Sequence, residues 1–126
     1  MREFFVPGKP IGQGAISTIR GRSFHSNGKE LIPWRESVGW CARAAKIPLL
    51  DGAVFVRYHF VIAKPKSVKR GEPFVVPDLD HYVRACGDAL KGIAFFDDSQ
   101  ICHITASKIY GERIGALITV GSLTEM

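Results

Sequence analysis

Residues 77–100 decide the fold, and they read PDLDHYVRACGDALKGIAFFDDSQ. Their apolar side chains recur at the three- and four-residue spacing of a helix over residues 79–91. Asp78 stands at the N-cap of this helix, and Gly92 stands where a left-handed residue ends it. The stretch therefore predicts a helix that begins with acidic residues, followed by a short apolar link and a second acidic pair.

Strand patterns lie on both sides of this helix. Residues 53–63 read AVFVRYHFVIA and alternate two faces, one of which carries Val54, Val56, Tyr58, Phe60 and Ile62. Further strands are predicted at residues 2–6, 101–110 and 113–120, and a first helix at residues 33–48. The order β-α-β-α-β-β predicts an α+β fold in a single domain over residues 1–126, with a mixed sheet backed by two helices.

The composition indicates a basic globular protein. Seventeen Lys and Arg residues against twelve Asp and Glu residues give a net charge of +5, which favours a polyanionic partner. No apolar run is long enough to span a bilayer and the start of the chain lacks a secretory signal, so we expect a cytoplasmic protein without membrane association. The three cysteines show no CxxC spacing, which argues against structural zinc.

Two loops carry much of the positive charge. Residues 64–73 read KPKSVKRGEP and predict an exposed basic loop. Residues 7–33 are rich in glycine and proline and predict a long loop with a loose hairpin, either a binding arm or a disordered segment. The candidate DNA-binding residues on these loops are Lys9, Arg20, Arg22, Lys64, Lys66, Lys69 and Arg70. The alternative is that they form an ordinary solvated surface.

The aspartates allow two interpretations. In the simpler one, Asp78 caps the helix, Asp80 pairs with Arg84 one turn later, and Asp97 and Asp98 form a turn. In the other, the non-helical conformation of an N-cap residue lets the carboxylates of Asp78 and Asp80 crowd one end of the helix. Crowded carboxylates repel each other unless a cation lies between them, and oxygen ligands of this kind suit Mg²⁺.

Chain length limits how Asp98 can join these carboxylates. A helix over residues 79–91 climbs about 18 Å, and the six steps from Gly92 to Asp98 return at most about 20 to 22 Å. Asp98 therefore reaches the start of the helix only if the chain doubles straight back along it. Otherwise it would join from a partner subunit.

The segment DLDHYVRACGDALKGIAFFDDSQI resembles the signature of the RusA family of Holliday junction resolvases. In that signature Asp-x-Asp-Asn opens a helix, a Lys follows, Asp-Ala-Leu continues the helix, and Asp-Asp-x-Gln comes after a short apolar link. The resemblance implies that Asp78, Asp80 and Asp98 bind catalytic Mg²⁺, or Mn²⁺, with Asp97 as a lesser candidate. It also implies a homodimer that acts on branched, four-way DNA.

Two positions depart from the signature. His81 stands where the family usually has Asn, and Arg84 where it usually has Lys. We assign His81 to DNA binding and Arg84 to stabilising charge on the scissile phosphate, so Arg84 joins Asp78, Asp80 and Asp98 as a catalytic residue.

The expected function is Mg²⁺-dependent resolution of four-way junctions by paired symmetric nicks, in DNA recombination and repair. The alternatives are a junction-binding module with weak or no turnover and a nuclease of flaps or forks. For the dimer, Trp34 lies on the apolar stripe of the first helix, whereas Trp40 lies off it and is a candidate interface residue.

Overall fold

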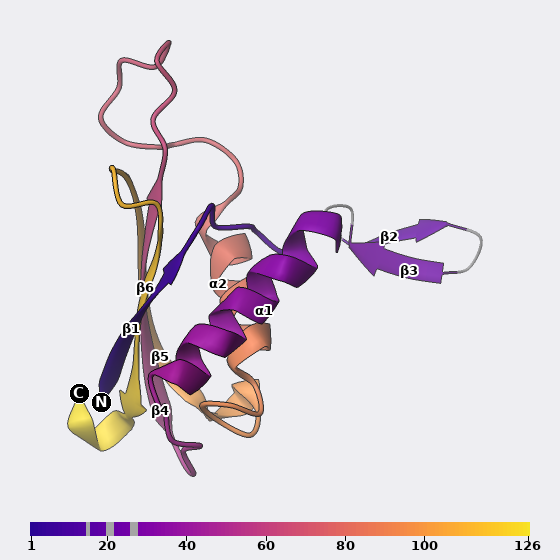
Figure 1. The fold of residues 1–126 in the computed structure, drawn as a ribbon. Helices are drawn as coiled ribbons and strands as arrows, with labels where there is room; N and C mark the ends of the chain where they lie inside the picture. Colours follow the sequence, from indigo (N-terminus) through magenta and orange to yellow (C-terminus); the bar gives the residue numbers. More distant parts are fainter. Residues whose placement is uncertain (15, 20–21, 26–27) are drawn as a thin grey trace.

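The computed structural model describes residues 1–14, 16–19, 22–25 and 28–126, and it shows one sheet with two helices packed on a single face (Figure 1). The sheet has the order β1-β6-β4-β5, with strands β1 (Arg2–Pro7), β4 (Val54–Ile62), β5 (Ile101–Tyr110) and β6 (Gly115–Ser122). The helices are α1 (Gly28–Ala44) and α2 (Leu79–Leu90). A separate hairpin of β2 (Ile16–Ile19) and β3 (Arg22–His25) and the short 3-10 helices η1 (Asp98–Gln100) and η2 (Leu123–Glu125) complete the described elements.

The sheet is mixed. β4 and β5 run parallel, whereas β6 is antiparallel to both β4 and β1. The predicted α+β class and the order β-α-β-α-β-β are confirmed. The loose hairpin predicted within residues 7–33 is observed as the pair β2–β3. Among the described helices, none has the length and apolar character needed to pass through a membrane.

The core lies between the sheet and the helices. The predicted inner face of β4 is buried at Val54, Val56, Tyr58 and Phe60. The Phe60 ring lies between two tyrosine rings, with centroids 5.7 Å from Tyr58 and 5.0 Å from Tyr82 on α2. Burial of each large side chain of this kind contributes about 1.5 to 3 kcal/mol. These contacts fix the rotation of α2 over the sheet.

Helix α1 begins earlier than its sequence pattern predicts. It starts at Gly28, so Pro33 lies inside the helix and not in its first turn. Proline lacks the N–H that would bond the carbonyl of Lys29, which is why the pattern suggested a start at residue 33. Leu31 is fully buried in the core, and such packing stabilises the additional turn. Trp34 is buried and Trp40 exposed, as predicted.

The last strand begins at Gly115, two residues after its predicted start. The preceding residues form a turn in which the Ile114 N–H donates to the Glu112 carbonyl at 3.1 Å. The Ile114 carbonyl accepts from the Gly8 N–H at 3.2 Å. Residue 114 therefore closes the turn before the strand begins.

A register shift near the start of β5 decides which of its side chains face the helices. Val54 pairs with Ile101, but Val56 pairs with Ile104. Cross-strand partners lie on the same face of a sheet, so both isoleucines lie on the face that α2 covers. In a regular strand, residues three apart would lie on opposite faces.

Gly115 provides a test of the contact between β1 and β6. Its φ is +154°, and an added Cβ would lie 2.2 Å from the carbonyl oxygen of Val6. We expect Gly115→Ala to lower the free energy of unfolding by more than about 2 kcal/mol in urea titrations. The control is Gly71→Ala, where no described atom lies within 4 Å of an added Cβ and a change below about 1 kcal/mol is expected. Equally small changes in both variants would contradict the strand pairing.

Candidate active site

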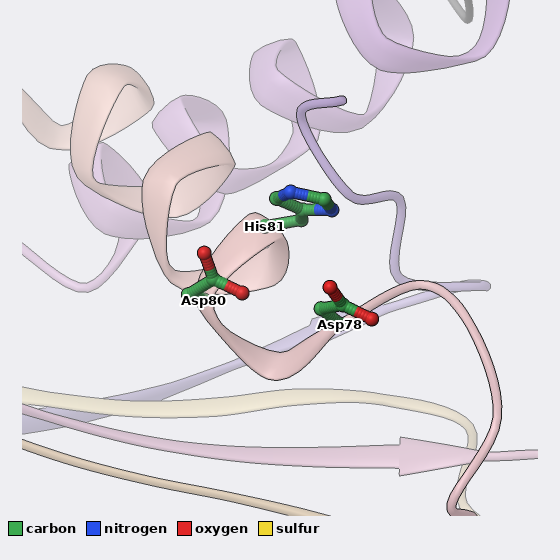
Figure 2. A group of neighbouring side chains, drawn as sticks. All are labelled: Asp78, Asp80 and His81. Atoms are coloured by element: carbon green, nitrogen blue, oxygen red, sulfur yellow. The ribbon is translucent and has the colours of Figure 1, made fainter. Parts of the chain in front are cut away.

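Two carboxylates and an imidazole meet at the start of α2 (Figure 2). One ligand atom from each of Asp78, Asp80 and His81 lies within 4.8 Å of the other two. Asp78 precedes the helix with extended backbone angles, φ −66° and ψ 150°, while Asp80 and His81 lie in its first turn. The extended N-cap residue is what allows carboxylates two residues apart to converge, as the sequence predicted.

The carboxylate of Asp78 is not used as a helix cap. Within the described structure its side chain accepts no capping hydrogen bond from the first turn of α2. Asp78 therefore occupies the predicted N-cap position without the side-chain hydrogen bond on which the simpler interpretation rests. Asp78 and Asp80 are both exposed. The partial positive charge at the N-terminal end of a helix stabilises the two carboxylates there.

A pocket between α2 and β5 adjoins this group and shares Asp80 with it. Asp80, Arg84 and Asp88 follow at intervals of four residues, so they lie along one face of α2. The charged lining residues are Asp80, Arg84, Asp88 and Asp98, and the remaining ones are Tyr58, Val83, Gly87, Ile101 and Ile104. The structure thus brings together the predicted residues Asp80, Arg84 and Asp98, and it adds Asp88.

Asp98 reaches the pocket from the same chain. After α2, Gly92 adopts a left-handed φ of +85°, and its N–H donates to the Phe95 carbonyl at 2.7 Å. The chain therefore doubles back at once, and Asp98 opens η1 just before β5. Asp98 lines the same pocket as Asp80 but is not part of the 4.8 Å group, as far as the described residues show.

Asp97 is engaged by other residues. Its Oδ2 accepts hydrogen bonds from the Ser99 hydroxyl at 2.6 Å and the Ser99 N–H at 3.2 Å. Lys91 Nζ lies 3.1 Å from its Oδ1. The hydrogen bonds from Ser99 and Lys91 lower the pKa of the Asp97 carboxyl to about 2. Since both oxygens have protein partners, we leave Asp97 out of the ligand set that we propose.

Residues 11–13 cross the start of α2 and hold it in place. The Gln13 N–H donates to the His81 carbonyl at 2.9 Å, and Gln13 Nε2 donates to Asp88 Oδ2 at 2.8 Å. At Gly12 an added Cβ would lie 2.8 Å from the Cβ of Pro77, so only glycine allows this approach. This part of the predicted loop is therefore a buried strap against the site and not a mobile arm.

Lys108 of β5 fixes the chain immediately before Asp78. Its Nζ donates to the carbonyls of Val75 at 2.7 Å and Pro77 at 3.0 Å. Lys108 pairs in register with Phe60, so its side chain leaves the sheet on the face that carries the helices. The position of Asp78 thus depends on β5 as well as on α2.

Two polar residues that line the pocket, Asp88 and Tyr58, were not selected as site residues from the sequence. Asp88 had a usable signal, because it follows Asp80 and Arg84 at the same four-residue interval. Tyr58 was predicted only as a core residue, yet its hydroxyl is buried without a hydrogen-bond partner among the described residues and its side chain lines the pocket. Burial raises the pKa of Tyr58 well above its ordinary value, so the hydroxyl remains a proton donor.

The predicted DNA-binding residues are found mainly on the loop between β4 and α2. Figure 1 shows this loop at the end of the molecule where α2 begins, away from both termini. Lys64, Lys66 and Lys69 are exposed there, and Lys9 is exposed after β1. Arg70 is half-buried, with its guanidinium carbon 4.4 Å from the centroid of the Phe74 ring. Arg20 and the side chain of Arg22 lie outside the described part of the chain.

The fold and the site together define a class of protein. The fold is a mixed sheet covered by two helices, and two carboxylates converge at the start of one of these helices, α2. A basic loop immediately precedes α2 in the chain. This combination is expected of a metal-dependent nuclease.

The family described as "Endodeoxyribonuclease RusA" matches residues 7–121, and the chain belongs to this family. The resemblance seen in residues 78–101 is thereby confirmed. The chain is also 26% identical over 126 residues to a protein of Bacillus subtilis (strain 168) named "Uncharacterized protein YqaN", covering 88% of this chain and 89% of that protein.

The neighbouring residues Asp97 and Asp98 allow a matched test of the ligand set. We expect Asp98→Asn to weaken Mn²⁺ binding at least about 10-fold, because Asp98 lines the pocket that Asp80 also lines. Asp97→Asn should leave Mn²⁺ affinity within about 2-fold of wild type, since its oxygens already bond Ser99 and Lys91. Titration followed by electron paramagnetic resonance of free Mn²⁺, without DNA, measures both. Weaker Mn²⁺ binding by Asp97→Asn with unchanged binding by Asp98→Asn would contradict this assignment and would make Asp97 the ligand.

Proposed function

We propose that the protein is a Mg²⁺-dependent endonuclease that resolves four-way DNA junctions by paired symmetric nicks, in DNA recombination and repair. One observation carries the proposal: Asp78 and Asp80 converge at the start of α2, and Arg84 and Asp98 line the adjoining pocket. Membership in an endodeoxyribonuclease family, whose members act on branched DNA, supports it. The proposed catalytic residues are Asp78, Asp80, Arg84 and Asp98, in one domain over residues 1–126.

The donor set fits a hard divalent cation. Carboxylate oxygens are the ligands that Mg²⁺ prefers, and the imidazole of His81 is a donor that Mn²⁺ also accepts. Asp78, Asp80 and Asp98 would hold the ion, and His81 is a further candidate ligand in addition to its predicted DNA contact. A bound Mg²⁺ supplies Lewis-acid polarisation of a phosphoryl oxygen and lowers the pKa of coordinated water.

Arg84 provides the positive charge beside the carboxylates. It lies one turn after Asp80 on the same face of α2 and is exposed at the pocket. A guanidinium holds two phosphate oxygens with parallel hydrogen bonds, which orients the scissile phosphate and stabilises the negative charge that develops on it. Arg84 therefore binds the phosphate and polarises it, and its planar fork of donors is not interchangeable with the point charge of a lysine.

The basic loops hold the DNA backbone at longer range. Lys64, Lys66, Lys69 and Arg70 precede the site in the chain, and Lys9 lies at the start of the segment that leads into the strap of residues 11–13. Arg20 and Arg22 complete the predicted set. Their contribution to binding is electrostatic and independent of DNA sequence, because it comes from neutralised phosphates and released counterions.

Paired nicks require two active sites, so we propose that the working form is a homodimer. Trp40 is 68% exposed on α1 and remains the candidate interface residue. The rival functions are a junction-binding module, favoured by Arg84 and His81 in place of the family's usual Lys and Asn, and a flap or fork nuclease.

A cleavage assay separates these functions. With Mg²⁺, the wild-type protein should nick two opposing strands of a synthetic four-way junction, and chelation by EDTA should abolish cutting. Asp80→Asn should cut at least about 100-fold more slowly while still binding the junction, because Asp80 belongs both to the carboxylate group and to the pocket. Junction binding with negligible cutting by both proteins would favour the binding module, and unpaired cuts confined to forks or flaps would favour the other nuclease.

The role of the basic loops predicts a steep salt response. If about six phosphates are neutralised, the logarithm of junction affinity should fall with the logarithm of salt concentration at a slope near −5. Lys66→Ala removes one exposed cation and should reduce the slope by about 1. Fluorescence anisotropy titrations between about 50 and about 200 mM salt measure the junction affinity and therefore its slope. A flat response would remove the electrostatic argument for DNA binding.

A further inference from the structure

Three consecutive apolar residues are exposed just before the candidate site. Phe74 is 74% exposed, Val75 41% and Val76 78%. Single exposed apolar side chains are common on protein surfaces, but a contiguous exposed group indicates a surface that is covered in the working complex. We call residues 74–76 the apolar tip.

The apolar tip is held in a defined conformation. The Phe74 and Val75 N–H groups donate to the carbonyls of Glu72 at 3.0 Å and Pro73 at 2.8 Å, and Lys108 Nζ donates to the Val75 carbonyl. The Arg70 guanidinium packs on the Phe74 ring, 4.4 Å from its centroid. The tip is therefore presented to solvent by its own backbone contacts and not left exposed by a lack of structure.

The apolar tip lies close to the proposed catalytic carboxylates. Only Pro77 separates Val76 from Asp78, and Phe74 is four residues before Asp78. An extended chain spans at most about 3.6 Å per residue, so Phe74 lies within about 15 Å of Asp78. Successive base pairs of duplex DNA are about 3.4 Å apart, so the tip lies within a few nucleotides of a phosphate bound at the site.

The charge around the apolar tip favours nucleic acid over a second copy of the protein. The same loop carries Lys64, Lys66, Lys69 and Arg70 against the single acid Glu72. Two such loops facing each other across a dimer axis would repel, whereas a DNA backbone attracts both. In an intact duplex the apolar faces of the bases are stacked and covered, but at a branch point base faces are available.

We propose that the apolar tip packs against an unstacked nucleobase at the branch point of the DNA, with Phe74 stacking on the base face; this rests on the proposed function. The tip then distinguishes branched DNA from duplex, while the surrounding cations bind both. Stacking is independent of base identity, so the contact selects structure and not sequence.

Phe74→Ala tests this division of roles in EDTA, where binding occurs without cutting. We expect the variant to lose about 5- to 150-fold in affinity for a four-way junction, with duplex affinity and salt slope unchanged. Phe74→Trp should restore the junction preference, and the exposed control Lys66→Ala should weaken junction and duplex binding equally. The fluorescence of a 2-aminopurine base placed at the branch point should change when wild-type protein binds and should not change when Phe74→Ala binds. Thermal unfolding of Phe74→Ala should match wild type because the side chain is exposed.

The outcomes distinguish this inference from the proposed function. A wild-type protein without preference for junction over duplex would overturn both. A wild-type preference that Phe74→Ala retains would overturn the inference alone. Loss of dimerisation in Phe74→Ala, measured by sedimentation velocity, would show that a second copy covers the tip and would also overturn it.

Discussion

The parallel pairing of β4 with β5 is the constraint on which the candidate site depends. Parallel strands cannot be joined by a tight hairpin, so the chain must return from the end of β4 to the start of β5 across one face of the sheet. Helix α2 makes that return. The crossover places Asp78 and Asp80 at the start of the helix and brings Asp98 back ahead of β5, where it lines a pocket with Asp80.

Packing converts this topology into a fixed site. The buried residues of α2 include Tyr82, Cys86 and Leu90, and their contact with the sheet orients Asp80 and Arg84 toward the pocket beside β5. Two further contacts hold the start of the helix, one from the strap through Gln13 and one from β5 through Lys108. Carboxylates that are already positioned require little ordering when they bind a cation, which favours both binding and rate.

The sequence was sufficient for features that depend on local patterns. Residues 101–110 form the predicted strand with the same bounds, and the predicted helix over residues 79–91 is observed as Leu79–Leu90. Features that depend on tertiary contacts were missed. The register shift in β5 brings Ile104 to the pocket, and the buried hydroxyl of Tyr58 reaches it from the sheet. The alternation of apolar and polar residues predicts neither the register shift nor the position of the Tyr58 hydroxyl. Asp88, in contrast, could have been found from helical spacing alone.

A crystal structure with Mn²⁺ tests the central claim most directly, because anomalous scattering locates the ion without reference to activity. We predict a peak beside the carboxylate of Asp80, at a coordination distance near 2.1 Å, with Asp78 and with Asp98 of the same chain among the other ligands. A peak remote from Asp80, or one completed by Asp98 of the partner subunit, would contradict the account.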